Sequence, residues 1–301
     1  MFSRSDESWS CPVPLPYGPL LACKEALPVE GEAEGAGCIL LAGGQGTRLG
    51  FEGPKGLFPL EGKTLFERLL GKVERKDRFI AVMTSPLNRE ETVAYFERVG
   101  RFGLTNLHFF SQGMLPLLDE RGEETGKLGP DGNGSFFRAF CEAGLDRLSG
   151  VDALQVLAVD NPLGRPFDEA LIAFHRRERA EATLACICRK EGEAMGLLVQ
   201  KGEKLAIREY SEIDPALLNE KRYPYGNSGR WVFSLDFVRR MALVELPFHW
   251  AEKRGLWKRE RFILDALPLA ERARAIAFPR HLTYAPVKRR EDILCLQKLD
   301  I

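Results

Sequence analysis

Apolar and polar residues form short alternating blocks from residue 37 onward. Predominantly apolar runs, typical of strands buried on both faces, lie at residues 38–42, 79–84, 107–110 and 154–159. Between them, apolar residues recur at helical spacing in segments 65–73 and 136–145, which predicts amphipathic helices. This alternation indicates an α/β fold with a mostly parallel sheet and helices on both of its faces.

The pattern changes in the second half of the chain, where short apolar runs follow one another without long helices between them. These runs lie at residues 183–189, 195–200, 205–210 and 230–233. We therefore expect a small antiparallel extension of the same sheet. Residues 290–299 carry apolar side chains at helical spacing, which predicts a C-terminal helix.

The first 36 residues differ from the rest of the chain. They are rich in Pro, Gly and Glu and show no sustained hydrophobic period, so we expect an N-terminal arm at residues 1–36. No linker is evident after this arm. Residues 37–301 are therefore predicted to form one principal domain.

The bulk charge indicates no particular macromolecular partner. Lys and Arg together number 43, as do Asp and Glu, so no net field favours nucleic acid or a membrane surface. No apolar run reaches membrane-spanning length, and the N-terminus lacks the apolar core of a secretory signal. The seven cysteines and four histidines show no spacing typical of zinc sites. These features predict reduced thiols and a cytoplasmic location, and a monomer is compatible with them.

The clearest chemical signal is a glycine-rich turn after the first apolar run. Residues 41–50 read Leu-Ala-Gly-Gly-Gln-Gly-Thr-Arg-Leu-Gly, and residues 53–56 read Gly-Pro-Lys-Gly. Glycines let backbone N–H groups approach an anion without a Cβ in the way, and clustered N–H dipoles bind it. Arg48 and Lys55 add positive charge where a polyphosphate would lie. The alternative is a tight turn with incidental charges, because glycine-rich turns are common in α/β folds.

Three better-known phosphate motifs do not fit this turn. A Walker A loop requires a lysine and then Ser or Thr directly after its last glycine, and no such pair occurs within residues 41–56. The dinucleotide fingerprint requires Gly or Ala where this chain has Leu49. The sequence also lacks the catalytic-loop and Asp-Phe-Gly motifs that accompany a kinase glycine loop.

Other polar residues follow predicted strands and so gather at one edge of the sheet, where open α/β sheets bind ligands. Asp160 ends the run 154–159 and is placed to hold a divalent ion such as Mg2+ beside phosphates, although turn and cap roles are equally common for an aspartate. Gln112 and Asn133 each offer a donor and an acceptor to a base or sugar. Residues 130–135, Pro-Asp-Gly-Asn-Gly-Ser, present bare backbone to a planar base, or simply cap the next helix.

Two further polar segments follow the second group of strands. Glu209 and Asn227 supply the carboxylate and amide that the hydroxyl and acetamido groups of a sugar require. Each is also ordinary at a strand end or turn. Lys288 is a weaker signal, because lone surface lysines are abundant.

Taken in order, these segments resemble the motifs of the UDP-sugar pyrophosphorylase family, in particular its UDP-N-acetylhexosamine (UDP-GlcNAc) pyrophosphorylases. The resemblance covers roughly residues 37–290, and its first motif, residues 41–56, is highly specific. The later motifs lie at residues 112–116, 130–134, 159–161, 209–212, 227–229 and 285–288.

The resemblance implies a glycosyltransferase-A-like fold, with residues 37–301 as the nucleotidyltransferase domain. It implies that UTP reacts with an N-acetylhexosamine 1-phosphate to give pyrophosphate and a UDP-N-acetylhexosamine such as UDP-N-acetylglucosamine. Carried over by motif, the catalytic cations would be Arg48, Lys55 and Lys288. The nucleotide would contact Leu41, Ala42, Gly43, Gly44, Gln112 and Gly132, the last two at the uracil. The sugar side would comprise Asn133, Gly196, Glu209 and Asn227. Asp160 would hold Mg2+.

The chain departs from the family pattern in two ways. Members are typically longer, so this chain resembles a trimmed catalytic core. The family's Asn-x-Gly-Asn is Asn227-Ser228-Gly229-Arg230 here, which puts an arginine where an amide is usual on the side expected to choose the sugar.

Three alternatives remain open. The first is a UTP–glucose-1-phosphate uridylyltransferase or a broad UDP-sugar pyrophosphorylase, although glucose-selective relatives tend to carry a histidine-rich loop in place of residues 130–134. The second is a glycosyltransferase that consumes a UDP-sugar, but its Asp-x-Asp metal motif is replaced by Asp160-Asn161-Pro162. The third is a nucleotide-binding protein without catalysis, which the joint presence of all the expected catalytic cations disfavours.

Overall fold

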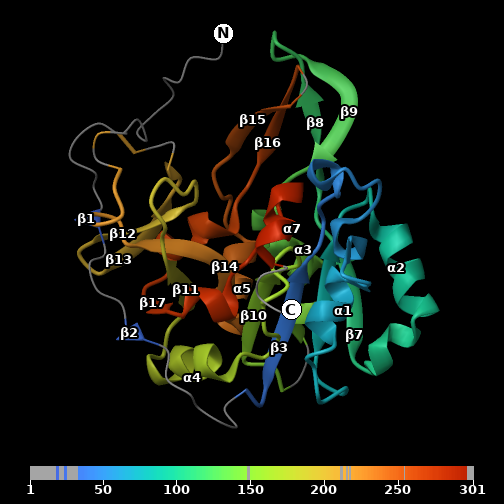
Figure 1. Ribbon diagram of the computed structural model, residues 1–301, viewed down its shortest axis with the longest axis horizontal. Coiled ribbons are helices and arrows are strands. Elements are labelled where there is room, and N and C mark those ends of the chain that lie inside the picture. The colour runs from blue at the N-terminus through green and yellow to red at the C-terminus, as the bar shows by residue number, and fades with distance from the viewer. Residues whose placement is uncertain are drawn as a thin grey trace.

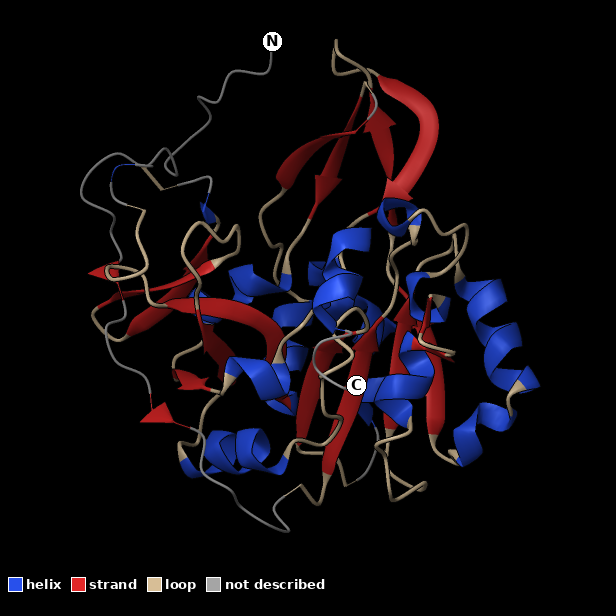
Figure 2. Cartoon of the chain, viewed as in Figure 1, coloured by secondary structure: helices blue, strands red, loops and turns tan. Residues whose placement is uncertain are grey.

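The computed structural model describes residues 18–19, 24–25, 33–147, 150–210, 213–214, 216, 218–253 and 255–296. Within these residues a central sheet of eleven strands is flanked by helices on both faces (Figures 1 and 2). A four-stranded sheet projects beyond it, at the top of Figure 1. This mixed α/β architecture confirms the fold class that the alternating runs predict.

The main path of the central sheet runs in the order β2-β17-β11-β14-β10-β3-β6-β7. Its members are β2 (Lys24–Glu25), β3 (Ala36–Leu41), β6 (Ile80–Thr84), β7 (Leu107–Ser111), β10 (Ala153–Ala158), β11 (Ala182–Cys188), β14 (Tyr225–Ser234) and β17 (Ala273–Ala277). Neighbouring strands are parallel except around β14, which runs antiparallel to both β10 and β11. The four buried strands predicted in the first half of the chain are therefore confirmed, as β3, β6, β7 and β10.

Short helices cover both faces of the sheet (Figure 2). They are α1 (Leu65–Leu70), α2 (Arg89–Arg98), α3 (Phe136–Glu142), α4 (Glu169–Arg177), α5 (Leu235–Ala242), α6 (Arg280–Thr283) and α7 (Arg290–Leu296). Helices α1 and α3 confirm the two predicted helices but end three residues before the predicted boundaries, where Gly71 and Gly144 follow in turns. Helix α7 begins where the sequence predicts, and residues 297–299 of that prediction lie outside the described residues.

Strand β3 supplies side chains to both hydrophobic layers of the protein. Cys38 and Leu40 pack in the layer that contains α1 and α4, and Ile39 packs in the layer that contains α3 and α5. All three side chains are fully buried. A central parallel strand that is covered on both faces reads as a continuous apolar run, and it holds the turn that follows firmly at the sheet edge.

The predicted antiparallel extension is confirmed. Strands β12 (Leu197–Lys201) and β13 (Lys204–Arg208) pair with each other, and β12 also pairs with β14 and with β1 (Gly18–Pro19). The prediction of a strand limited to residues 230–233 is wrong, because β14 begins at Tyr225. Asn227 therefore lies inside a strand and not in a turn beside one.

A β-bulge explains this longer strand. The pairing register between β14 and β11 shifts between Ala185 and Cys186. Gly229 takes a φ of 71°, and the Ser228 hydroxyl donates a hydrogen bond of 2.5 Å to the Ala185 carbonyl. A bulge of this kind lets a strand continue through turn-like residues and re-aims their side chains.

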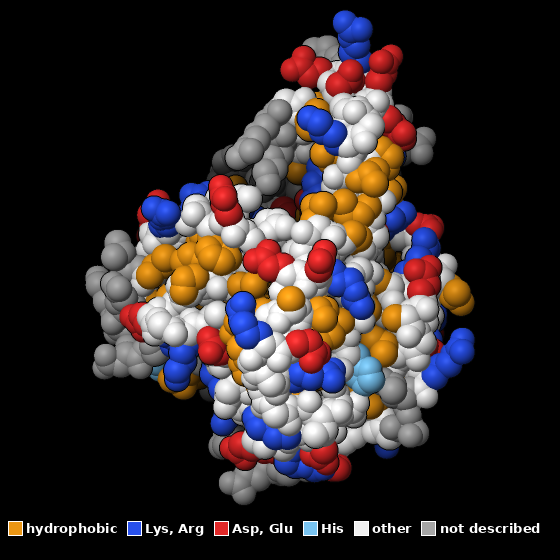
Figure 3. All heavy atoms as spheres, turned by 90° about the vertical axis from the view of Figure 1, so that its right-hand side faces the viewer, with side chains coloured by type: hydrophobic (Ala, Val, Ile, Leu, Met, Phe, Trp, Pro, Cys, Tyr) orange, Lys and Arg blue, Asp and Glu red, His pale blue; other side chains and the backbone are white. Residues whose placement is uncertain are grey.

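The projecting four-stranded sheet has the order β15-β16-β8-β9 and was not predicted. Its strands are β15 (His249–Lys253), β16 (Leu256–Glu260), β8 (Met114–Leu118) and β9 (Glu124–Pro130), and a separate small hairpin joins β4 (Pro59–Leu60) to β5 (Lys63–Thr64). Hydrophobic side chains gather along the projection in Figure 3, and charges of both signs are interspersed over the rest of that face. Among the helices of the described residues, none is long and apolar enough to cross a membrane.

Candidate active site

The two glycine-rich turns fold back on each other at the end of β3. Gln45 and Pro54 form an isolated antiparallel bridge. The Lys55 amide donates to the Gly44 carbonyl at 3.0 Å, and the Gly46 amide donates to the Gly53 carbonyl at 2.9 Å. These bonds bring the two predicted segments into one loop, which we call the phosphate loop (residues 43–56).

Asn88 holds the phosphate loop through side-chain hydrogen bonds, a role that the sequence analysis did not predict. Its side-chain amide donates to the carbonyls of Ala42 at 2.9 Å and Gly44 at 3.2 Å, and the residue is 2% exposed. The Ser85 amide in turn donates to Asn88 Oδ1 at 2.9 Å. An asparagine just before helix α2 reads as an ordinary helix cap, so the sequence offers no sign of this role.

Lys55 and Asp160 are brought together by the parallel pairing of β3 and β10. The Lys55 ammonium donates to Asp160 Oδ2 at 2.8 Å, and their side chains are 14% and 21% exposed. The two residues follow neighbouring parallel strands, so their contact shows that the segments after these strands lie side by side, as expected at the edge of the sheet.

Lys288 belongs to a C-terminal segment that is hydrogen-bonded to Asp160 and Asn161. The Val287 amide donates to the Asp160 carbonyl at 2.7 Å. Asn161 binds this segment on both sides, donating to the Thr283 carbonyl at 2.8 Å and accepting from the Ala285 amide at 3.0 Å. Lys288 itself is exposed.

Arg48 lies at the open side of the phosphate loop. It belongs to a 3-10 turn, Thr47–Leu49, and its side chain is exposed. No hydrogen bond or ion pair joins its side chain to another of the described residues. The predicted catalytic cations therefore belong to segments at the ends of β3 and β10, and the side chains of Arg48 and Lys288 are exposed.

Gln112 follows β7 and packs against the phosphate loop. It is only 6% exposed, and a Cβ added to Gly43 would lie 2.8 Å from its Oε1 atom. Gln112 is therefore not a solvated side chain but lies directly beside Gly43, and its role at the uracil stays a prediction. The glycine is required because the glutamine carboxamide fills the space of a side chain.

Gly132 is held by a segment that follows the projecting sheet. Its φ is +97°, and a Cβ there would lie 2.3 Å from the Arg261 carbonyl oxygen. The Arg261 amide donates to the Asp131 carbonyl at 2.8 Å, and its carbonyl accepts from the Gly134 amide at 2.8 Å. Arg261 thus fixes the backbone of the loop expected at the base, a role that has no sequence signature.

Asp131 and Asn133 flank Gly132 and are also engaged within the protein. Burial raises the pKa of the Asp131 carboxyl, although the hydroxyl of Ser135 and the charge of Arg261 act in the opposite direction. Asn133 Oδ1 accepts a hydrogen bond of 3.0 Å from the Ile263 amide. Among the described residues, none forms a hydrogen bond with the side-chain nitrogen of Asn133, and its role at the sugar stays a prediction.

Three of the residues expected on the sugar side lie together. The backbone N–H of Asn227 donates a hydrogen bond of 2.9 Å to the Gly196 carbonyl. A Cβ added to Gly196 would lie 3.2 Å from Glu209 Oε1 and 3.8 Å from Asn227 Cβ. The Glu209 carboxylate and the Asn227 side chain therefore lie beside Gly196. Together they offer the hydrogen-bond donors and acceptors that a sugar requires.

Arg230, the departure from the family motif, is buried. It is 1% exposed, its guanidinium pairs with Asp168 at 2.8 Å, and it lies 4.3 Å from the centre of the Phe278 ring. Asp168 also caps helix α4 by accepting from the Leu171 amide. The arginine is therefore held by partners inside the protein.

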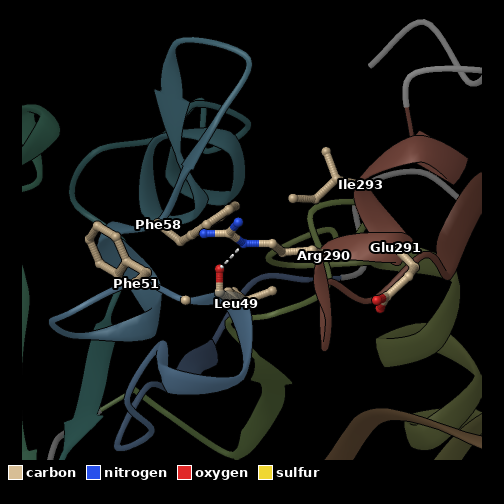
Figure 4. A pocket seen from close by; sticks show the side chains of 7 residues that line it. Leu49, Phe51, Phe58, Arg290, Glu291 and Ile293 are labelled. Atoms are coloured by element: carbon tan, nitrogen blue, oxygen red, sulfur yellow. Dashed lines mark hydrogen bonds between the residues drawn. The ribbon is translucent and has the colours of Figure 1, made fainter.

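A cavity of about 620 Å³ lies between the phosphate loop and helix α7 (Figure 4). It is lined by Leu49, Gly50, Phe51, Phe58, Arg290, Glu291 and Ile293. None of the residues predicted to contact nucleotide or sugar lines it. This cavity belongs to the loop's supporting structure and is not the predicted substrate site.

Asp160 is the carboxylate best placed for a metal ion at the phosphate loop. Among the described residues, no cluster of three or more His, Cys, Asp or Glu side chains could hold a metal by itself. Mg2+ commonly uses one or two carboxylates and takes its remaining ligands from phosphates and water. A single carboxylate beside the phosphate loop fits an ion that arrives with the nucleotide.

Comparison with known proteins decides the family. The family model described as UTP–glucose-1-phosphate uridylyltransferase matches residues 34–299. The chain belongs to this family. The match covers almost the whole sequence and confirms the resemblance drawn from the motifs.

Two relatives of the chain are named for the synthesis of UDP-N-acetylglucosamine. The chain is 29% identical to a protein named "Probable UDP-N-acetylglucosamine pyrophosphorylase" from Encephalitozoon cuniculi, over 85% of this chain and 81% of that one. It is 32% identical to UDP-N-acetylglucosamine diphosphorylase 1 from Arabidopsis thaliana, over 84% of this chain and 60% of the plant protein. The chain thus spans less than two thirds of the plant relative.

A solved structure with the same type of name has a similar fold. The UDP-N-acetylglucosamine pyrophosphorylase of Trypanosoma brucei superposes with a TM-score of 0.74 at 26% identity. The match covers 87% of this chain and 64% of that protein.

Proposed function

We propose that this protein is a uridylyltransferase that makes UDP-N-acetylglucosamine, or another UDP-N-acetylhexosamine, and pyrophosphate from UTP and the sugar 1-phosphate. The observation that carries the proposal is the joining of Lys55, Asp160 and the Lys288 segment at the phosphate loop. Gln112 lies against the same loop. The names of the relatives support the N-acetylated sugar.

In the proposed reaction, a phosphate oxygen of the sugar 1-phosphate attacks the α-phosphorus of UTP, and pyrophosphate leaves. The attacking oxygen is already an anion, so no general base is needed. The protein contributes alignment and charge neutralisation. The amides of the phosphate loop bind the phosphates, and Arg48, Lys55 and Lys288 balance the charge that moves to the leaving group.

We propose that Asp160 holds Mg2+ together with phosphate oxygens of UTP. When bound, the ion would screen phosphate charge and polarise the phosphoryl group under attack. Asp160 would hold the ion through the same carboxylate that pairs with Lys55 in the free protein, and Lys55 would then pair with the phosphates. A cytoplasmic location fits the free thiols of Cys38, Cys141, Cys186 and Cys188, and the proposal requires no more than a monomer.

The decisive experiment is a panel of sugar 1-phosphates with UTP and Mg2+, followed by pyrophosphate release. We expect the highest kcat/KM with an N-acetylhexosamine 1-phosphate. Preference for glucose 1-phosphate would replace the proposal with the glucose enzyme. UTP binding by calorimetry without turnover of any sugar would indicate a nucleotide-binding protein.

A further inference from the structure

Arg290, the first residue of helix α7, contacts the phosphate loop. Arg290 Nε donates a hydrogen bond of 2.9 Å to the Leu49 carbonyl, across 241 positions of sequence (Figure 4). Leu49 is the last residue of the 3-10 turn that carries Arg48. The terminal carbonyls of such a turn lack partners within it, so the guanidinium satisfies a group that would otherwise bind only water.

The loop is shaped to receive this side chain. Gly50 has a φ of +67°, and a Cβ at that position would lie 2.6 Å from Arg290 Nη2. The Leu49 amide donates to the Gly46 carbonyl at 2.8 Å on the other side of the turn. Residues 46–50 are therefore held by hydrogen bonds within the loop and by the hydrogen bond from Arg290.

The same stretch of chain places Lys288. Val287, one residue before Lys288, donates to the Asp160 carbonyl. The amides of Lys288 and Arg289 both donate to Asp292 Oδ2 at 2.7 Å, which closes the first turn of α7. The short segment 287–292 is thus attached to Asp160 at one end and to Leu49 at the other.

We propose that Arg290 is a positioning residue that fixes Arg48 relative to Lys288 and Asp160. The inference rests on the proposed function, because its consequence is the alignment of cations around the UTP phosphates. Arg48 and Lys288 lie far apart in the sequence, and the hydrogen bond from Arg290 to the Leu49 carbonyl links their two segments. Misplacing a charge by about 1 Å can cost about a hundredfold in rate.

The bond can be tested separately from the charge. Gln at this position has an N–H at the same number of bonds from the backbone as Arg Nε, while Met has similar length and no donor. We expect R290M to lower kcat/KM for UTP by roughly ten- to a hundredfold, and R290Q to retain most of the activity. If R290Q falls as far as R290M, the charge itself acts and the positioning role is wrong.

A double-mutant cycle tests whether Arg290 works through Arg48. In an R48A background, R290M should change kcat/KM much less than it does in the wild type, because the group to be positioned is gone. Equal fold-changes in both backgrounds would overturn the proposal. R289M, at the exposed neighbour, is the matched control and should leave kcat/KM unchanged.

Hydrogen exchange separates this inference from the proposed function, because it needs no substrate. In the free protein, amides of residues 46–50 should exchange faster in R290M than in wild type, and R290Q should restore their protection. Unchanged exchange would refute the positioning role even if the enzyme is active. Failure of the wild type to turn over UTP, with exchange behaving as expected, would refute only the function.

Discussion

The ammonium of Lys55 lies 2.8 Å from the carboxylate of Asp160, although 105 positions separate them in sequence. The pair joins two groups that are expected to bind different partners, phosphate and metal. Both side chains are mostly covered, so in the free protein each charge is balanced by the other. If Lys55 binds phosphate and Asp160 binds the metal, as we propose, both would leave this pair together, which predicts a tight dependence of UTP binding on Mg2+.

Replacing Asp160 by Asn should separate binding from catalysis. The change removes the proposed metal ligand and leaves Lys55 free for phosphate. We expect kcat to fall on the order of a hundredfold, while the KM for UTP changes little. The Mg2+ concentration that gives half-maximal rate should rise, as measured by pyrophosphate release over a magnesium series. D236N, at a side chain that is 93% exposed, is the control. Unchanged magnesium dependence in D160N would exclude Asp160 as a ligand.

Gly44 tests whether the open face of the phosphate loop is a ligand site. No atom lies within 4 Å of a Cβ built at this position. G44A should therefore change the free energy of unfolding by less than about 0.5 kcal/mol. UTP should nevertheless bind at least about tenfold more weakly, because the methyl group occupies space next to the loop amides. The loss would appear as a smaller thermal shift on adding UTP and Mg2+.

Gly56 provides the contrasting case on the same loop. A Cβ there would lie 2.2 Å from the Phe66 ring, so G56A should lower stability even without ligand. If G44A binds UTP as tightly as wild type, the open face does not contact the nucleotide.

Gly132 can be compared with a glycine of the same backbone conformation. Gly132 and Gly126 both have positive φ, at +97° and +72°, so alanine strains both by about 1–3 kcal/mol. Only at Gly132 does the new Cβ meet backbone, 2.3 Å from the Arg261 carbonyl oxygen. We expect G132A to weaken UTP binding at least about tenfold in calorimetry and G126A to leave it unchanged. Equal affinities in the two variants would show that this loop does not hold the base.

The sequence predicted the elements whose signal is local. Strand β3 is a continuous apolar run because both of its faces are covered, and the phosphate loop follows it directly. The projecting sheet consists of two local hairpins, β8–β9 and β15–β16, which a single long-range pairing of Trp257 with Leu118 joins. It was missed because its strands show no regular alternation of apolar and polar residues that would mark them.

The residues of the candidate site also differ in how far the sequence predicts them. Asp160 and Asn227, which belong to motifs, lie beside other residues of the predicted site, Lys55 and Gly196 respectively, and their roles stay predictions. Asn88, Arg261 and Arg290 were missed because each acts through hydrogen bonds to backbone atoms of a distant segment. Such bonds do not depend on a sequence pattern, so only the folded chain reveals them.

Arg230 tests whether the arginine in the sugar-side motif affects the choice of sugar. Because it is buried and paired with Asp168, we expect R230N to leave the ratio of kcat/KM between sugar 1-phosphates unchanged. The variant should instead lose about 3–5 kcal/mol of stability, since Asp168 would keep an unpaired buried charge. R240N removes a more exposed pair with Glu181 and should cost less than about 1 kcal/mol. A changed sugar ratio in R230N would place the arginine at the sugar.

His175 predicts how stability depends on acid. It is 3% exposed, its ring bonds to Thr183 at 2.9 Å, and burial lowers its pKa from 6.5 to about 4. Between these values the unfolded chain binds a proton that the folded chain does not, so stability falls as pH falls from 6.5 toward 4. The loss attributable to this residue should reach up to about 3 kcal/mol. Urea unfolding at several pH values should show a flatter dependence in H175N than in wild type, even though H175N is less stable at pH 7. H281N, at an exposed histidine, should retain the wild-type slope, and an equally steep slope in H175N would assign the acid sensitivity to other groups.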